Sequence, residues 1–121
     1  MAKAKKRGKA THYTRGKSFE YRPRDDLREK LYFVVQAGGS KGIADLVAVK
    51  KGVVLFVQAK TNGKLGFKEW NAVYDAAMEF GAVPIFVSRL GKSTNWKLVY
   101  YRLLAPKVFR SRIWPMEPFE P

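Results

Sequence analysis

Three polar side chains interrupt two apolar segments near the middle of the chain. Asp45 lies within the run IADLVAV, and Gln58 and Lys60 end the next run, VVLFVQAK. A carboxylate among valines is costly unless a cation or strong hydrogen bonds stabilise it. Carboxylate and amide oxygens are ligands that Mg²⁺ and Ca²⁺ accept. The pattern therefore predicts that Asp45 and Gln58 hold one cation with Lys60 beside it; the alternative is a metal-free ion pair between Asp45 and Lys60.

The turn between these segments decides whether the polar side chains meet. Lys51-Gly52 suits a two-residue hairpin, because glycine accepts the positive φ that such turns need. With two residues in the turn, the register sets Asp45 directly opposite Gln58 on one face of the sheet, with Cβ atoms about 4.5–5.5 Å apart. A three-residue turn would put Asp45 out of register.

The elements around this hairpin follow from hydrophobic periodicity. Helices are expected over 18–30 and 68–80, and strands over 31–37, 43–50, 53–60, 83–88 and 96–101. A strand, a crossover helix and another strand imply a parallel connection, so the fold class is α/β, a mixed β-sheet of about five strands flanked by helices.

Individual residues add detail to the predictions for the two helices. Pro23 predicts a kink or a late start in the first helix. In the second, Trp70, Val73, Ala77 and Phe80 share the face expected to pack on the core, and Gly81 lies where a C-terminal cap belongs.

Composition limits the class of protein. The 121 residues carry 24 Lys plus Arg against 10 Asp plus Glu, a formal net charge of +14, with no cysteine and one histidine. These counts exclude a disulfide scaffold and make an all-protein zinc site untenable. The longest apolar run, Val53 to Val57, is far too short to span a membrane, so a cytoplasmic protein without membrane association is expected. The charge favours a polyanionic partner, with nucleic acid first.

The same features divide the chain into three parts. Residues 1–17 hold seven basic residues and no acidic one, which predicts a flexible arm that contacts phosphate. Residues 18–104 form the expected domain. Residues 105–121 carry four of the six prolines and are expected to form an irregular tail over the domain or a partner subunit.

Several motifs together resemble a known family. The helix glutamate, the aspartate and the Gln-x-Lys pattern are similar to the PD-(D/E)XK nuclease superfamily, whose fold is restriction-endonuclease-like. Within it, GKSFEYR, GGSKG, GIADLVAV and VQAKTNG resemble the Holliday junction resolvases of archaea and bacteriophages, over roughly residues 16–87.

The resemblance implies roles for individual residues. Glu20, Asp45 and Gln58 would surround Mg²⁺, with Mn²⁺ as a substitute, and the carbonyl of Ala59 would be a further ligand; no small-molecule cofactor is implied. Lys60 would orient the attacking water or neutralise charge at the phosphate. Gln58 stands where many members have a carboxylate, which implies weaker metal binding or a single ion.

Nucleic-acid contacts are expected from basic residues and from one loop. The family loop near the scissile strand corresponds to 37–42. The expected contacts are Arg15, Lys17, Arg24, Ser40, Lys41 and Lys64.

The resemblance implies a homodimeric, metal-dependent endodeoxyribonuclease that cuts four-way DNA junctions by paired nicks in a prokaryotic or phage-infected cell. Two alternatives remain at this point. One is a flap, single-strand or repair-type nuclease of the same superfamily, since fold does not decide the substrate. The other is a non-catalytic basic nucleic-acid-binding module, which charge and size fit equally well.

Overall fold

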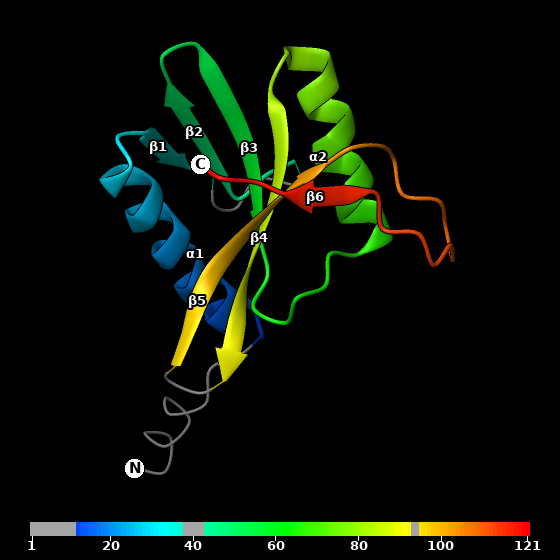
Figure 1. Cartoon of the computed structure of the whole chain (residues 1–121), viewed down its shortest axis with the longest axis horizontal. Helices are drawn as coiled ribbons and strands as arrows, with labels where there is room; N and C mark the ends of the chain where they lie inside the picture. The colour runs from blue at the N-terminus through cyan, green and yellow to red at the C-terminus, as the bar shows by residue number, and fades with distance from the viewer. Residues whose placement is uncertain (1–11, 38–42, 93–94) are drawn as a thin grey trace.

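The computed structural model describes residues 12–37, 43–92 and 95–121, which form a mixed sheet with a helix on each face (Figure 1). The predicted α/β class is confirmed, with six strands in place of about five. In chain order the elements are α1 (His12–Glu29), β1 (Phe33–Gln36), β2 (Leu46–Lys50), β3 (Val53–Ala59), α2 (Phe67–Phe80), β4 (Val83–Lys92), β5 (Asn95–Leu103) and β6 (Met116–Pro118). No helix in these residues is long and apolar enough to cross a membrane.

The strands lie in the sheet in their chain order, from β1 at one edge to β6 at the other. All neighbours are antiparallel except β3 and β4, which are parallel and joined through α2. This is the predicted strand–helix–strand connection. The β4–β5 hairpin is longer than expected, because both strands extend into the predicted loop over 89–95.

Helix α1 begins at His12, so the helix start predicted at residue 18 is six residues too late, and the helix extends into the stretch expected to be a flexible arm. The late start expected from Pro23 is also wrong. Pro23 is buried in line with Phe19 and Leu27, four residues to either side, and this apolar packing offsets the backbone hydrogen bond that proline cannot donate. The rest of the arm, residues 1–11, lies outside the described part.

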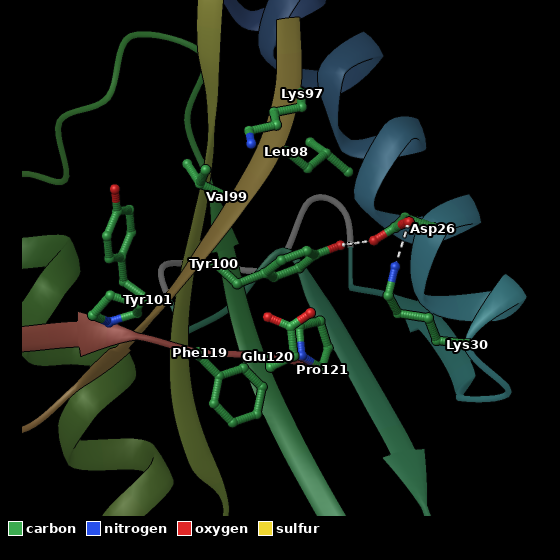
Figure 2. A pocket seen from close by; sticks show the side chains of 11 residues that line it. Asp26, Lys30, Lys97, Leu98, Val99, Tyr100, Tyr101, Phe119, Glu120 and Pro121 are labelled. Carbon is green, nitrogen blue, oxygen red and sulfur yellow. Dashed lines mark hydrogen bonds and ion pairs between the residues drawn. The ribbon is translucent and has the colours of Figure 1, made fainter.

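Asp26 connects α1 to β5, the fifth of the six strands in the sheet. The Tyr100 hydroxyl donates to Asp26 Oδ2 at 2.7 Å, and Lys30 Nζ donates to Asp26 Oδ1 at 2.8 Å (Figure 2). These residues line an open cavity of about 540 Å³ beside β5. The contact holds the helix against β5 and so fixes the direction in which its first half points.

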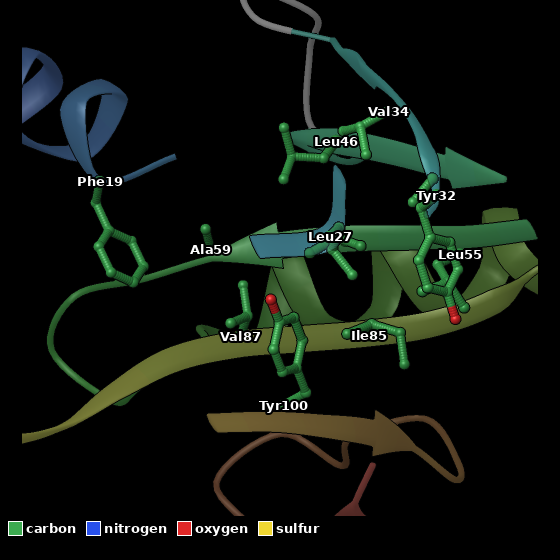
Figure 3. Packing of buried hydrophobic residues seen from close by; sticks show 12 residues of the cluster. Phe19, Leu27, Tyr32, Val34, Leu46, Leu55, Ala59, Ile85, Val87 and Tyr100 are labelled. Atoms are coloured by element: carbon green, nitrogen blue, oxygen red, sulfur yellow. The ribbon is translucent and has the colours of Figure 1, made fainter. Parts of the chain in front are cut away.

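The two helices pack on opposite faces of the sheet. On the α1 side, Leu27 lies against a cluster that includes Leu55, Val57, Ile85 and Val87 (Figure 3). On the α2 side, the buried cluster is Ala44, Leu65, Trp70, Val73, Phe86 and Leu103. Because side chains alternate along a strand, β3 and β4 contribute to both clusters.

The β2–β3 hairpin has the predicted two-residue turn. Lys51 and Gly52 both have positive φ, 45° and 85°, and the ladder runs from Lys50 opposite Val53 to Leu46 opposite Val57. The strand before the turn begins at Leu46 and not at residue 43, so Asp45 lies just outside it.

Helix α2 ends as predicted. Gly81 has a φ of 73°, and its N–H donates to the carbonyl of Ala77. Trp70, Val73 and Ala77 are buried as expected, but Phe80 is 67% exposed. Residues 78–81 are all exposed, because the last turn of the helix lies beyond the buried part of the sheet.

The C-terminal segment is more regular than predicted. Residues 116–118 form β6, which adds to β5 at the edge of the sheet, so the expectation of an irregular tail is wrong there. Before it, the segment is held against α2: Trp70 Nε1 donates to the Ala105 carbonyl at 2.9 Å, and the Asn71 side chain bonds both the N–H and the carbonyl of Lys107. The segment therefore lies over the domain, as expected.

Candidate active site

Asp45 closes the end of the β2–β3 ladder with its backbone and its side chain. Its N–H donates to the carbonyl of Val57 at 2.8 Å, and its Oδ2 accepts the N–H of Ala59 at 2.9 Å. The regular register thus stops one pair before the predicted Asp45–Gln58 pair. The carboxylate takes the place of a backbone carbonyl, which anchors it beside the last residues of β3.

Helix α1 brings Glu20 to the same place. Glu20 is 8% exposed, and its carboxyl group hydrogen-bonds to that of Asp45. Burial raises the pKa of Asp45, while the Ala59 N–H, Lys60 and Glu20 act in the opposite direction. Two carboxyl groups hydrogen-bond each other only while one of them holds a proton. The fold thus brings Glu20 to Asp45, although 25 residues separate them in the chain.

Lys60 directly follows β3 and forms an ion pair that the sequence analysis did not foresee. Its Nζ lies 2.8 Å from Oε2 of Glu69 in the first turn of α2, and both side chains are partly exposed. Its N–H donates to the carbonyl of Val87 at 3.0 Å, which anchors the backbone on β4. The sequence did hold a signal for Glu69, because it is an acidic residue in the first turn of the helix expected after Lys60.

Gln58 lies on the α2 face of β3, next to Phe86 of β4, and is 4% exposed. Lys60 is two residues further along the same face. Gln58 also directly precedes Ala59, whose N–H bonds Asp45. Structure and spacing thus bring the four predicted catalytic residues to one end of the hairpin.

The atoms at this site that could bind a metal ion are all oxygen atoms. Among the described residues, no three acidic, histidine or cysteine side chains are grouped for metal binding. Available are the carboxyl groups of Glu20 and Asp45, the amide oxygen of Gln58 and the carbonyl of Ala59. A buried carboxyl group beside a half-buried one, together with neutral oxygens, suits a hard divalent cation.

The six residues predicted to contact DNA differ in where the structure places them and in whether they are described. Arg24 is engaged within the protein, by Asp25 at 2.8 Å and by Gln36 Oε1 at 3.0 Å. Lys64 is exposed in the loop after Lys60. Of the other four, Arg15 and Lys17 lie in α1 within residues 12–18, of which only the backbone is described, and Ser40 and Lys41 lie outside the described residues.

Comparison with known proteins places this site in a family, although no family model matches the chain. The chain is 40% identical over 99 residues to the crossover junction endodeoxyribonuclease Hjc of Methanocaldococcus jannaschii, covering 70% of this chain and 74% of that protein. It also resembles the solved structure of Archaeoglobus fulgidus Hjc, a Holliday junction resolvase, with a TM-score of 0.58 and 20% identity over 69% of this chain and 70% of that one. The similarity to the Archaeoglobus fulgidus structure shows that the two chains share a fold. Sequence identity and fold together show that the chain belongs to the Hjc family of Holliday junction resolvases in the PD-(D/E)XK nuclease superfamily.

Proposed function

We propose that this protein is a metal-dependent endodeoxyribonuclease that resolves four-way DNA junctions by paired phosphodiester hydrolysis. The observation that supports it best is the contact of Glu20 with Asp45 at the end of β3, beside Lys60, in a chain 40% identical to a crossover junction endodeoxyribonuclease. A basic binding module has no need of a buried glutamate in contact with a half-buried aspartate.

Each site residue has a distinct task in this proposal. Glu20, Asp45, Gln58 and the Ala59 carbonyl hold Mg²⁺, which when bound neutralises phosphate charge and lowers the pKa of water. The Ala59 N–H fixes the Asp45 carboxylate in position. Lys60 donates to a phosphate oxygen or to the attacking water, and Glu69 holds its ammonium group near the site until DNA replaces the ion pair.

We also propose that two copies act together, because resolution needs two nicks on opposite strands. The sheet offers a surface for pairing that we call the apolar sheet patch: Phe33, Val35, Val49, Phe56 and Phe80. Phe33 and Val49 are cross-strand partners on the α2 face, and Phe80 packs on Phe56 at the end of α2. Phe33 is 70% exposed. Exposed apolar patches of this kind mark interfaces between proteins.

The test is a nicking assay on a synthetic four-way junction, a flap, a single strand and a matched duplex, with Mg²⁺, Mn²⁺ or EDTA. Symmetric, metal-dependent cuts in the junction alone are expected, and Asp45→Asn should lose them while it keeps junction binding. Equal cutting of flaps, single strands and junctions would favour the repair-type nuclease. Binding without cutting under any metal would favour the non-catalytic module and overturn the proposal.

A further inference from the structure

The chain between β5 and β6 forms a closed loop, residues 105–114, which we call the C-terminal loop. At its base, the N–H of Leu104 donates to the carbonyl of Pro115 at 2.8 Å. Inside it, the side chain of Lys107 is buried, and its ammonium group donates to carbonyl groups at both ends of the tip, residues 108–111. These hydrogen bonds hold the tip in one shape before any partner binds.

The tip presents apolar side chains to solvent beside positive charges. Val108 is 67% exposed and Phe109 is 62% exposed, even though the Phe109 ring packs on Phe67 with 5.2 Å between ring centroids. Arg110 and Arg112 are exposed, and neither forms an ion pair with another described residue. The C-terminal loop contains no acidic residue. A preordered surface of this kind fits an anionic partner that also has apolar faces.

The C-terminal loop lies at the end of α2 that carries the candidate active site (Figure 1). Phe67, on which Phe109 packs, is the first residue of α2, and Glu69, the partner of Lys60, is two residues further on. The apolar sheet patch includes Phe80 at the other end of α2, about 20 Å along the helix. A second copy bound at that patch leaves the loop free, whereas DNA with a phosphate at Lys60 runs close to it.

We propose that the tip of the C-terminal loop covers the face of a base pair at the branch point of the DNA, an inference that rests on the proposed function. In continuous duplex every base pair is stacked between two neighbours, whereas at a branch the stacking is incomplete. Val108 and Phe109 bury the exposed face by apolar contact, without reading the identity of the base. Arg110 and Arg112 bind phosphates of the strands that diverge there. The loop thus adds a preference for branched DNA that a phosphate contact at Lys60 cannot supply.

The apolar part is tested by the binding of a four-way junction and of a matched linear duplex in the Asp45→Asn background. Val108→Ser combined with Phe109→Ser should weaken junction binding roughly tenfold and leave duplex binding unchanged. Leu31→Ser is the matched control, since Leu31 is 80% exposed near Lys50, at the turn end of the β2–β3 hairpin and away from the site. A double variant that distinguishes junction from duplex as strongly as its parent would overturn the inference and leave a protein partner as the occupant of the tip.

The charged part has a separate readout. Arg110→Gln and Arg112→Gln should each lower the slope of log junction affinity against log salt by about 0.9, the value for one phosphate contact. Lys51→Gln, which removes one exposed charge at the hairpin turn, should leave the slope unchanged. Unchanged slopes in both arginine variants would refute the phosphate contacts of the loop.

Cleavage by the proteins that retain Asp45 is scored separately, so that the two proposals can fail independently. Junction cutting by the wild type, together with undiminished selectivity of the tip variant, refutes the role of the loop alone. Loss of selectivity in the tip variant, together with no cutting by the wild type under any metal, refutes the proposed hydrolysis alone.

Discussion

Lys60 Nζ and Glu69 Oε2 lie 2.8 Å apart and join the residue after β3 to the first turn of α2. Both side chains are more than a third exposed, so the pair contributes little to stability. Its consequence is positional: the pair holds the ammonium group of Lys60 at the end of β3, where the proposed mechanism places the DNA phosphate.

Glu69→Gln should therefore change catalysis more than folding. Loss of a negative charge near the phosphate path should tighten junction binding about two- to fivefold, while the unanchored Lys60 should slow single-turnover cleavage about tenfold. Glu79→Gln, at the exposed other end of the same helix, is the control. Binding and cleavage both equal to wild type would show that the ion pair has no part in the site.

Asp45→Asn should stabilise the metal-free protein while it abolishes cleavage. Burial raises the pKa of Asp45, which means that the fold accommodates the ionised carboxylate less well than water does, so an uncharged amide that still accepts the Ala59 N–H should add about 1 kcal/mol. Mg²⁺ should raise the thermal midpoint of the wild type and leave the variant unchanged. Asp75→Asn, an exposed change on α2, controls for net charge; a Mg²⁺ shift retained in Asp45→Asn would remove Asp45 from the metal site.

Phe33→Glu should separate the two copies. A charge within the apolar sheet patch opposes burial against a second subunit, and Phe33 is exposed enough for the monomer to tolerate it. Light scattering should give half the mass of the wild type, with single nicks in place of paired cuts. Val53→Glu, on the other face of the same hairpin, should remain dimeric; an unchanged mass for Phe33→Glu would place the interface elsewhere.

Alkaline pH should destabilise the fold through Tyr100. Burial, and then the hydrogen bond to Asp26, raise the pKa of Tyr100 well above its ordinary value. The unfolded chain therefore loses this proton first, and stability present below about pH 10 should fall by up to about 1.4 kcal/mol per further pH unit. Denaturant unfolding at pH 8 and above pH 10 measures the loss. Tyr100→Phe should be less stable at pH 8 and show a smaller alkaline loss; an equal loss would assign the effect to other groups.

Deletion of residues 1–11 should weaken DNA binding and its salt dependence. The deletion removes five basic residues and leaves α1 intact from His12. Each phosphate contact that is lost lowers the slope of log affinity against log salt by about 0.9. Binding titrations at several salt concentrations measure the slope, and an unchanged slope would show that these residues do not contact phosphate.

The sequence alone determined the features that depend on neighbours in the chain. The Lys51-Gly52 turn, the alternation that carries Gln58 and Lys60, and the apolar face and glycine cap of α2 are set by local backbone preferences and periodicity. The motifs GIADLVAV and VQAKTNG lie on and beside this hairpin, which is why Asp45, Gln58 and Lys60 could be proposed as site residues before the fold was known.

The tertiary structure decided what depends on contacts between distant segments. The position of Glu20 is set by the packing of α1 on the sheet and by Asp26 with Tyr100, 74 residues away. The Lys60–Glu69 pair depends on how α2 returns to β3. The contact of Trp114 with Trp70 exists because the C-terminal segment folds back over α2. Local propensity carries no information on such contacts, because their energy appears only when separate surfaces are buried together.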